Sequence, residues 1–218
     1  ITLLEFSNLM LRENSGAYIP SVNLKDEKIT GLDTCTELTT LNVSGCTNIS
    51  ELNLNSNTKV ETVNLSNCNA LTSFVMGDDT VGNYLLNSID LTGCNNLETL
   101  EINSAMYLTS FDFTDKTKIK SVDLGGCQGI TYLAGLSGKT SLQFLDIAAL
   151  NKITEIDVSG CSALTNLSIT ACSALETLNL GYSGVTTFNS STDTMNLSSY
   201  TNLKNVYLHN FSAPFKTI

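Results

Sequence analysis

The chain has 218 residues, of which 42% are hydrophobic and 15% charged, so it carries enough apolar material for a sizeable core and is typical of neither a disordered chain nor a minimal disulfide scaffold. The formal net charge of −10, from 21 acidic against 11 basic residues, repels nucleic-acid phosphates and anionic lipid and favours neutral or basic partners. No apolar run approaches the roughly 18 to 20 residues that cross a bilayer, which argues against membrane insertion.

Residues 1–18 are expected to form an N-terminal cap. The opening stretch, ITLLEFSNLML, is apolar, but Glu5 interrupts it and no basic flank precedes it, so it is not typical of a secretory signal. Thr2 and Glu5 have the spacing of a capping box, which predicts a short helix. If the protein is exported, its signal is absent from this chain.

An eleven-residue repeat dominates residues 19–211. Each unit has an apolar residue followed by others three and five positions later, and apolar residues two apart, such as Leu41 and Val43, indicate a strand with one buried face. Eleven residues are too few for a whole turn of a solenoid, so two units are predicted to form one coil of about 22 residues with a strand on each side. The units begin at Leu38, Ile49, Val60, Leu71, Leu86, Leu97, Leu108, Ile119, Ile130, Leu142, Ile153, Leu164, Leu175 and Leu203.

Three interruptions of the repeat are predicted to be loops. The step from Leu71 to Leu86 is fifteen residues long and contains GDDTVGNY, and the unit that begins at Ile130 is stretched by one residue around Gly135. The third interruption is the polar stretch 189–202, where Met195 and Leu197 could belong to one more degenerate strand. The phase of the repeats in 185–202 is left open. Residues 212–218 are expected to form a C-terminal cap or tail.

Cysteine recurs at the eighth position of the units. These residues lack the short C-x-x-C pairs of zinc sites, and the chain has a single histidine, His209, so no metal site is expected. They are predicted to be reduced, inward-facing fillers of a corner. With two units per coil, Cys46, Cys68 and Cys94 should stack in one column, and Cys127 and Cys172 in the other.

The pattern L-x-x-L-x-L-x-x-[N/C], as in LTTLNVSGCTN, LNSIDLTGCNN and LTNLSITACSA, resembles the leucine-rich repeat. It most resembles the cysteine-ladder type of internalin J-like bacterial surface proteins, over roughly residues 19–211. In this chain the second half of each coil repeats the strand pattern instead of a helix. The resemblance therefore implies a β-rich, right-handed superhelix with parallel strands on both faces. It also implies a secreted or surface-attached bacterial protein that serves in binding or adhesion.

One candidate binding surface follows from the strand alternation. Glu101, Asp123 and Asp146 should point outward on successive coils, close enough to attract a cation or a basic partner, and Phe144 should be an exposed aromatic beside them. These four residues are the predicted partner-binding site, and Tyr132 is the counterpart of Phe144 on the other face. The alternative interpretation is that this position merely prefers Asp or Asn, since the other face reads Asn42, Asn64, Asp90, Asp112, Ala134, Asp157 and Asn179.

The predicted function is an extracellular or cell-surface module, a monomer, that binds a protein or glycan partner. An enzyme and a cofactor are not expected, because the acidic residues have no catalytic groups converging on them and His209 should face outward. Nucleic-acid binding and membrane insertion are not expected either, because of the charge and the hydropathy described above. Two alternatives stay open: a β-helix-like polysaccharide lyase or hydrolase, favoured by a cleft with paired carboxylates near His209 or a lysine, and a structural spacer of a larger surface protein. We expect Asp123→Ala and Phe144→Ala to leave stability nearly unchanged and Leu145→Ala to be costly.

Overall fold

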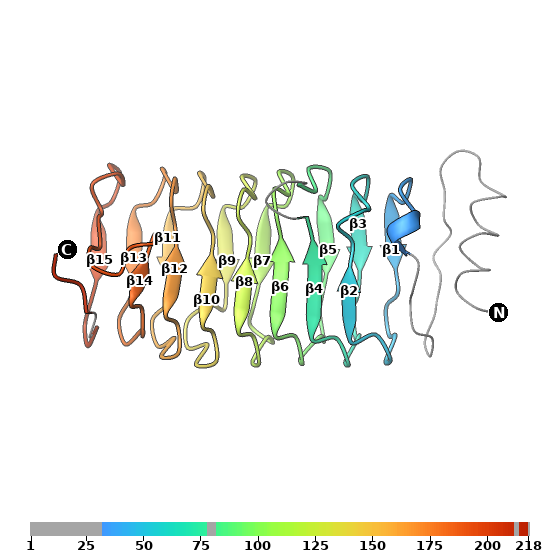
Figure 1. The fold of residues 1–218 in the computed structure, drawn as a ribbon, viewed down its shortest axis with the longest axis horizontal. Helices are drawn as coiled ribbons and strands as arrows, with labels where there is room; N and C mark the ends of the chain where they lie inside the picture. Colours follow the sequence, from blue (N-terminus) through green and yellow to red (C-terminus); the bar gives the residue numbers. More distant parts are fainter. Residues whose placement is uncertain (1–31, 78–81, 212–213, 218) are drawn as a thin grey trace.

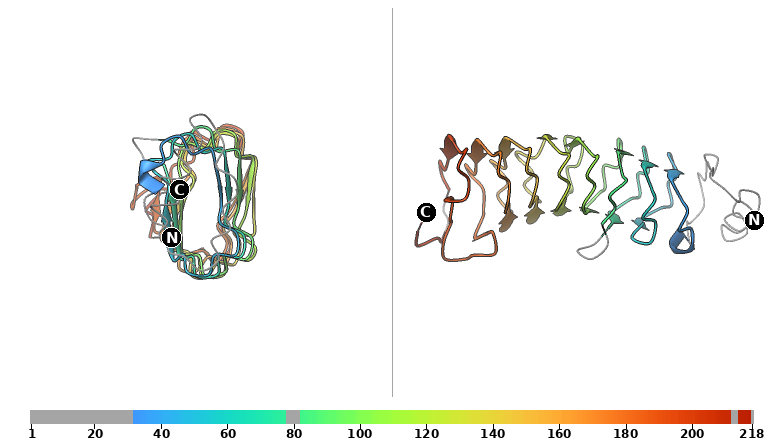
Figure 2. Two further views of the ribbon diagram at one scale, coloured as in Figure 1. Left: turned by 90° about the vertical axis from the view of Figure 1, so that its right-hand side faces the viewer. Right: turned by 90° about the horizontal axis from the view of Figure 1, so that it is seen from above.

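The computed structural model describes residues 32–77, 82–211 and 214–217, and these form a parallel β-solenoid (Figure 1). Strand pairs confirm the coil length, since Thr40 is aligned with Thr62 and Ser121 with Phe144. Each eleven-residue unit supplies one short strand and one corner, so consecutive strands alternate between two opposite faces, which the end view displays (Figure 2). The predicted N-terminal cap at 1–18 lies outside the described residues, which begin with a short 3-10 helix, Leu32–Thr34.

One face is an uninterrupted sheet of seven strands, which we call the continuous face. Each strand of this face pairs with the strand of the same face one coil later in the chain. The sheet therefore runs through these coils without a gap. The strands are β2 (Glu51–Asn53), β4 (Ser73–Met76), β6 (Thr99–Ile102), β8 (Ser121–Asp123), β10 (Phe144–Asp146), β12 (Asn166–Ser168) and β14 (Thr187–Phe188).

The opposite face is divided into three sheets, and we call it the broken face. Hydrogen-bonded pairing stops between β5 and β7 and again between β9 and β11, so the pair β7–β9 stands as an island. The strands of this face are β1 (Thr40–Asn42), β3 (Thr62–Asn64), β5 (Ser88–Asp90), β7 (Ser110–Asp112), β9 (Tyr132–Ala134), β11 (Glu155–Asp157), β13 (Thr177–Asn179) and β15 (Asn205–Tyr207).

The core is a single apolar column between the two faces. Most residues at the predicted inward positions are almost wholly buried; Leu145 and Val122, for example, are 0% exposed, whereas Val206 on β15 is 37% exposed. All seven cysteines are buried and in the reduced state, as predicted for those at the eighth position. The thiols also join coils, because Cys127 Sγ donates to Ile102 O at 3.0 Å and Cys172 Sγ to Ile147 O at 3.2 Å.

The two cysteine columns are as predicted, but two of their positions hold lysine. On the broken face the eighth positions run Cys94, Lys116, Lys139 and Cys161, and both lysine side chains are buried, with Lys116 only 2% exposed. Lys139 Nζ donates to Thr114 O at 3.1 Å, which is the kind of coil-to-coil contact that a thiol makes elsewhere. The two lysines belong to the coils of the island.

Most corners contain a residue with left-handed backbone immediately before the eighth position. Gly45 and Gly160, with φ of 74° and 72°, are examples, and glycine adopts this region without strain. The N–H of this residue usually donates to a carbonyl of the next coil, as Gly45 N does to Ser66 O at 2.7 Å. Asp115 stands at this position before Lys116 and is not left-handed.

At the C-terminal end, the irregular stretch after β14 folds against residues 216–217. Met195 is buried and its N–H donates to Thr217 O at 3.0 Å, so the degenerate strand anticipated there is an isolated bridge between Thr194 and Thr217. Phe211 and Phe215 pack on the core, with ring centroids 6.4 Å apart. Across the described part of the chain, no helix has the length and apolarity needed to cross a bilayer.

Candidate functional site: two hollows in the broken face

The predicted acidic row exists on the continuous face. Glu101 on β6 is aligned with Asp123 on β8, and Asp123 with Asp146 on β10. The carboxylates of the two aspartates also hold the backbone, because Asp123 Oδ1 accepts from Gly125 N at 2.9 Å and Asp146 Oδ1 from Ala148 N at 2.8 Å. Part of the preference for Asp at this position is therefore structural: its side chain closes the turn after the strand.

Phe144 was predicted to be an exposed aromatic, and that prediction was wrong in degree. Its side chain points outward from β10 but is half-buried. It lies in register with Ser121 on β8 and Asn166 on β12, so neighbouring strands flank it on both sides. Its counterpart Tyr132 on the broken face is 60% exposed.

The turn hydrogen bond also changes the expectation for Asp123. We now expect Asp123→Ala to lower the free energy of unfolding by about 0.5 to 1.5 kcal/mol, because Gly125 N–H loses its acceptor. Asp123→Asn should be nearly neutral, since Asn53 closes the same turn on β2 through Oδ1 and Asn55 N at 2.8 Å. Urea unfolding of the two variants checks this, and equal losses for Ala and Asn would contradict it.

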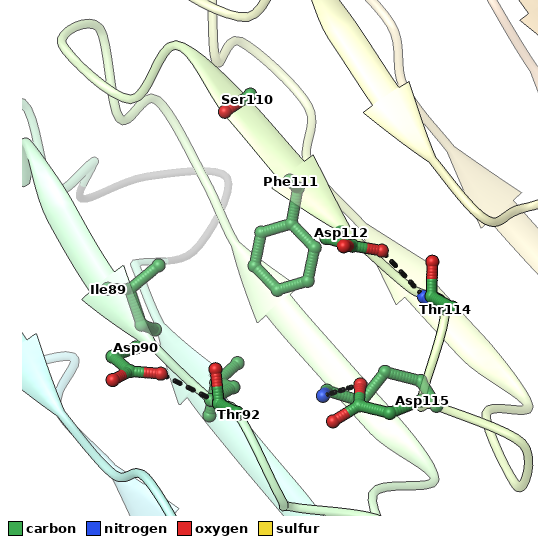
Figure 3. Close-up of a pocket in the computed structure, with 10 residues that line it drawn as sticks. Ile89, Asp90, Thr92, Ser110, Phe111, Asp112, Thr114 and Asp115 are labelled. Carbon is green, nitrogen blue, oxygen red and sulfur yellow. Dashed lines mark hydrogen bonds and ion pairs between the residues drawn. The ribbon is translucent and has the colours of Figure 1, made fainter.

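The first break in the broken face opens a hollow of about 410 Å³, which we call the β5–β7 hollow (Figure 3). Asp90 projects from β5 and Asp112 from β7, on opposite sides of the Phe111 ring. Phe111 is 7% exposed and is aimed toward Ile89. The hollow is lined by Ile89, Asp90, Leu91, Thr92, Ser110, Phe111, Asp112, Thr114, Asp115 and Lys116.

Bulky inward side chains account for this break. The half-coil of β7 places Phe111, Phe113 and Lys116 at its inward positions, and the two rings pack with centroids 4.7 Å apart. The equivalent half-coil one coil earlier, that of β5, has the smaller Ile89, Leu91 and Cys94 there. Since protein cores are close-packed, the larger set holds the two coils apart at this point.

An ion pair between the buried Lys116 and the partly exposed Asp115 spans the parted corner. Lys116 Nζ contacts Asp115 Oδ1, and Asp115 Oδ2 accepts from Gly93 N at 3.0 Å, in place of the carbonyl that serves other corners. Burial acts to raise the pKa of Asp115, but the Lys116 ammonium and the Gly93 N–H outweigh it and the pKa is lowered. The lysine charge is therefore balanced inside the wall of the hollow.

Two further carboxylates leave the hollow acidic. Asp90 Oδ1 accepts from Thr92 N at 2.9 Å, and Asp112 Oδ1 accepts from Thr114 N at 2.8 Å. Hydrogen bonds from the Thr114 side chain and backbone lower the pKa of Asp112. With Lys116 matched by Asp115, the carboxylates of Asp90 and Asp112 give this site a net negative charge.

The second break forms a smaller hollow of about 140 Å³, the β9–β11 hollow. Gly135, where the repeat is stretched by one residue, follows β9 directly, has a left-handed φ of 68° and lines this hollow. Tyr132 on the island lines one side, and Glu155 and Asp157 on β11 line the other. The island therefore lies between two hollows with acidic rims.

Exposed apolar side chains gather at the corners that lead into β5 and β7. Tyr84 and Leu85 are 54% and 40% exposed, and Met106 and Tyr107 are 45% and 61% exposed. Each pair precedes its strand by the same number of residues, so the two pairs occupy equivalent corners of successive coils. This apolar corner lies at the start of the strands that border the β5–β7 hollow.

The β5–β7 hollow partly meets the condition stated above for the enzyme alternative, because carboxylates and a lysine line it together. General acid catalysis needs a carboxyl group with a raised pKa, whereas the pKa values of Asp112 and Asp115 are lowered. His209 is exposed and packs edge-on against Tyr182, with ring centroids 5.1 Å apart. Within the described ranges, no group of three or more His, Cys, Asp or Glu residues could hold a metal ion.

No family model and no curated protein matches the sequence. Among solved structures, a leucine-rich-repeat protein of Leptospira interrogans aligns over 88% of this chain and 60% of its own, with 12% identity and a TM-score of 0.26. The functional domain of InlJ from Listeria monocytogenes, which includes a cysteine ladder, aligns over 89% of this chain and 64% of its own, with 16% identity and a TM-score of 0.18. The chain thus spans less than two thirds of either structure.

The coil geometry itself decides the fold class. Parallel coils of 22 residues carry the L-x-x-L-x-L pattern inward at nearly every turn. The chain is a leucine-rich-repeat-like β-solenoid. The island of this solenoid lies between two hollows, and the sequence had indicated only Tyr132 there as a possible contact.

Proposed function

We propose that this solenoid is a binding module that captures a basic segment of a partner protein on the broken face, outside the cell or at its surface. The observation that supports it is the island β7–β9, which presents Tyr132 between two hollows with acidic rims. An exposed tyrosine beside indentations is the kind of anchor that interfaces use. The low share of charged residues, 15%, supports the extracellular setting.

Charge supports a basic partner over a neutral one. The chain carries a net charge of −10, and Asp90, Asp112, Glu155 and Asp157 all face the two hollows. Opposite charge steers the encounter and excludes acidic competitors. The acidic row of Glu101, Asp123 and Asp146 with Phe144 on the continuous face is the second candidate surface, supported by the alignment of its three carboxylates.

Selection from a random peptide library displayed on phage tests the proposal. We expect the immobilised chain to enrich peptides rich in Arg or Lys, and Tyr132→Ser to weaken their binding by about tenfold or more. Tyr182→Ser is the matched control, because Tyr182 is 55% exposed and lies outside both hollows.

The variant Asp146→Asn distinguishes binding on the continuous face from binding on the broken face. Selected peptides that lose affinity with Asp146→Asn but not with Tyr132→Ser would move the site to the continuous face. A selection that enriches no basic peptide would overturn the proposed function as a whole.

A further inference from the structure

We propose that the β5–β7 hollow receives an arginine side chain of the partner protein. This inference rests on the proposed function and specifies what its broken face recognises. The hollow is open to an incoming side chain because β5 and β7 are not hydrogen-bonded to each other. Its volume of about 410 Å³ lies within the usual range of small ligand sites.

The charges around the hollow favour a cation. Lys116, the basic residue of the lining, is matched by Asp115, which leaves the carboxylates of Asp90 and Asp112 on opposite walls. An anionic group would be repelled from both. A neutral side chain would displace water from two carboxylates without replacing their hydrogen bonds, which is unfavourable.

The shape and chemistry of the walls favour arginine over lysine. Each aspartate accepts one turn N–H at Oδ1, and Asp112 also accepts from the Thr114 side chain, but a carboxylate has about four acceptor sites and so retains capacity for a ligand. A guanidinium group has five donors in a plane and can hydrogen-bond to carboxylates on two sides, whereas an ammonium group is a point charge. Phe111 lines the hollow beside these aspartates (Figure 3), and the apolar stem of an arginine side chain can pack against it.

Substitution by asparagine removes the charge while keeping the fold. Asn64 stands at the same place on β3 and closes its turn through Oδ1 and Ser66 N at 3.0 Å, and Asn179 does so on β13 with Gly181 N at 3.1 Å. The double variant Asp90→Asn/Asp112→Asn should therefore fold like the parent chain. Asp157→Asn is the matched control, because Asp157 closes the same turn at Ser159 N but lines the other hollow.

N-acetyl-arginine amide is the probe, titrated into isotope-labelled protein and followed by NMR. We expect shifts at the amides of β5 and β7 and at the Phe111 ring, with a dissociation constant in the millimolar range. The double variant should weaken binding by about tenfold, and Asp157→Asn should leave it unchanged. N-acetyl-citrulline amide, which has the same shape without the charge, should not bind.

Three outcomes would overturn the inference: shifts that map outside the hollow, equal binding of the citrulline compound or of N-acetyl-lysine amide, or full binding by the double variant. The two proposals fail separately. If basic peptides from the library still depend on Tyr132 while the arginine probe does not bind the hollow, only the arginine site is lost. If the library yields no basic peptide, the proposed function is lost whatever the probe does.

Discussion

Replacing Leu145 by alanine should lower the free energy of unfolding by about 2 to 5 kcal/mol. Leu145 is wholly buried in β10, in register with Val122 on β8 and Leu167 on β12, which are also buried. Hydrogen-bonded strands hold the backbone on both sides, so the neighbouring coils cannot collapse into the space that is left. The loss therefore includes a cavity as well as the buried methyl groups.

The neighbouring residue provides the control for Leu145. Phe144 is larger but half-buried and outward-facing, so Phe144→Ala should cost only about 1 kcal/mol despite the greater number of atoms removed. Urea unfolding of both variants, followed by circular dichroism, gives the two values. A Phe144 variant as unstable as the Leu145 variant would mean that the strand faces have been assigned the wrong way round.

The coil and its faces could be predicted because two regularities determine them. A strand alternates its side chains with a period of two, and a constant coil length aligns equivalent residues. Glu101, Asp123 and Asp146 are 22 and 23 positions apart, so their alignment on adjacent strands follows from the repeat alone. The same arithmetic placed Cys94 and Cys127 in different columns.

The two hollows could not be predicted in the same way, because they depend on volume and local backbone. A pattern of apolar positions treats Phe111 and Phe113 like the Leu and Ile of other coils, although the rings occupy more space. A partial signal was present in the sequence: Lys116 stands where cysteine is usual, and the repeat is stretched just after Tyr132. The ion pair of Lys116 with Asp115 depends on a corner that lacks the left-handed backbone found at most others.

Raising the pH above about 9 should destabilise the protein by several kcal/mol, because the buried thiols resist ionisation. Burial raises the pKa of Cys127 and Cys172 to about 12 and that of Cys94 and Cys161 to about 11, from an ordinary value of 9.0. The carboxylates of Asp123 and Asp146 add to the effect at Cys127 and Cys172, and backbone hydrogen bonds oppose it.

The direction of the pH effect follows from the order of the pKa values. Below pH 9 the thiols are protonated in both states, and their contribution to stability is complete. Above pH 9 the unfolded chain releases these protons while the folded chain retains them, so the contribution is lost progressively as the pH rises toward 11 and 12. One pKa unit corresponds to about 1.4 kcal/mol, so each of these thiols accounts for about 3 to 4 kcal/mol over this range.

Two measurements check the alkaline effect. One is the urea unfolding midpoint between pH 7 and pH 11, and the other is the ultraviolet absorbance of thiolate in the folded protein over the same pH range. Cys127→Ser is the matched variant, because Ser183 already occupies a ladder position, where its Oγ donates to Leu180 O at 2.8 Å. A serine does not titrate in this range, so the variant should lose stability less steeply with pH than the parent chain, whatever its stability at pH 7. Thiolate absorbance that rises in the folded state as early as in the unfolded chain, or equal slopes for the two proteins, would show that the ladder does not hold these protons.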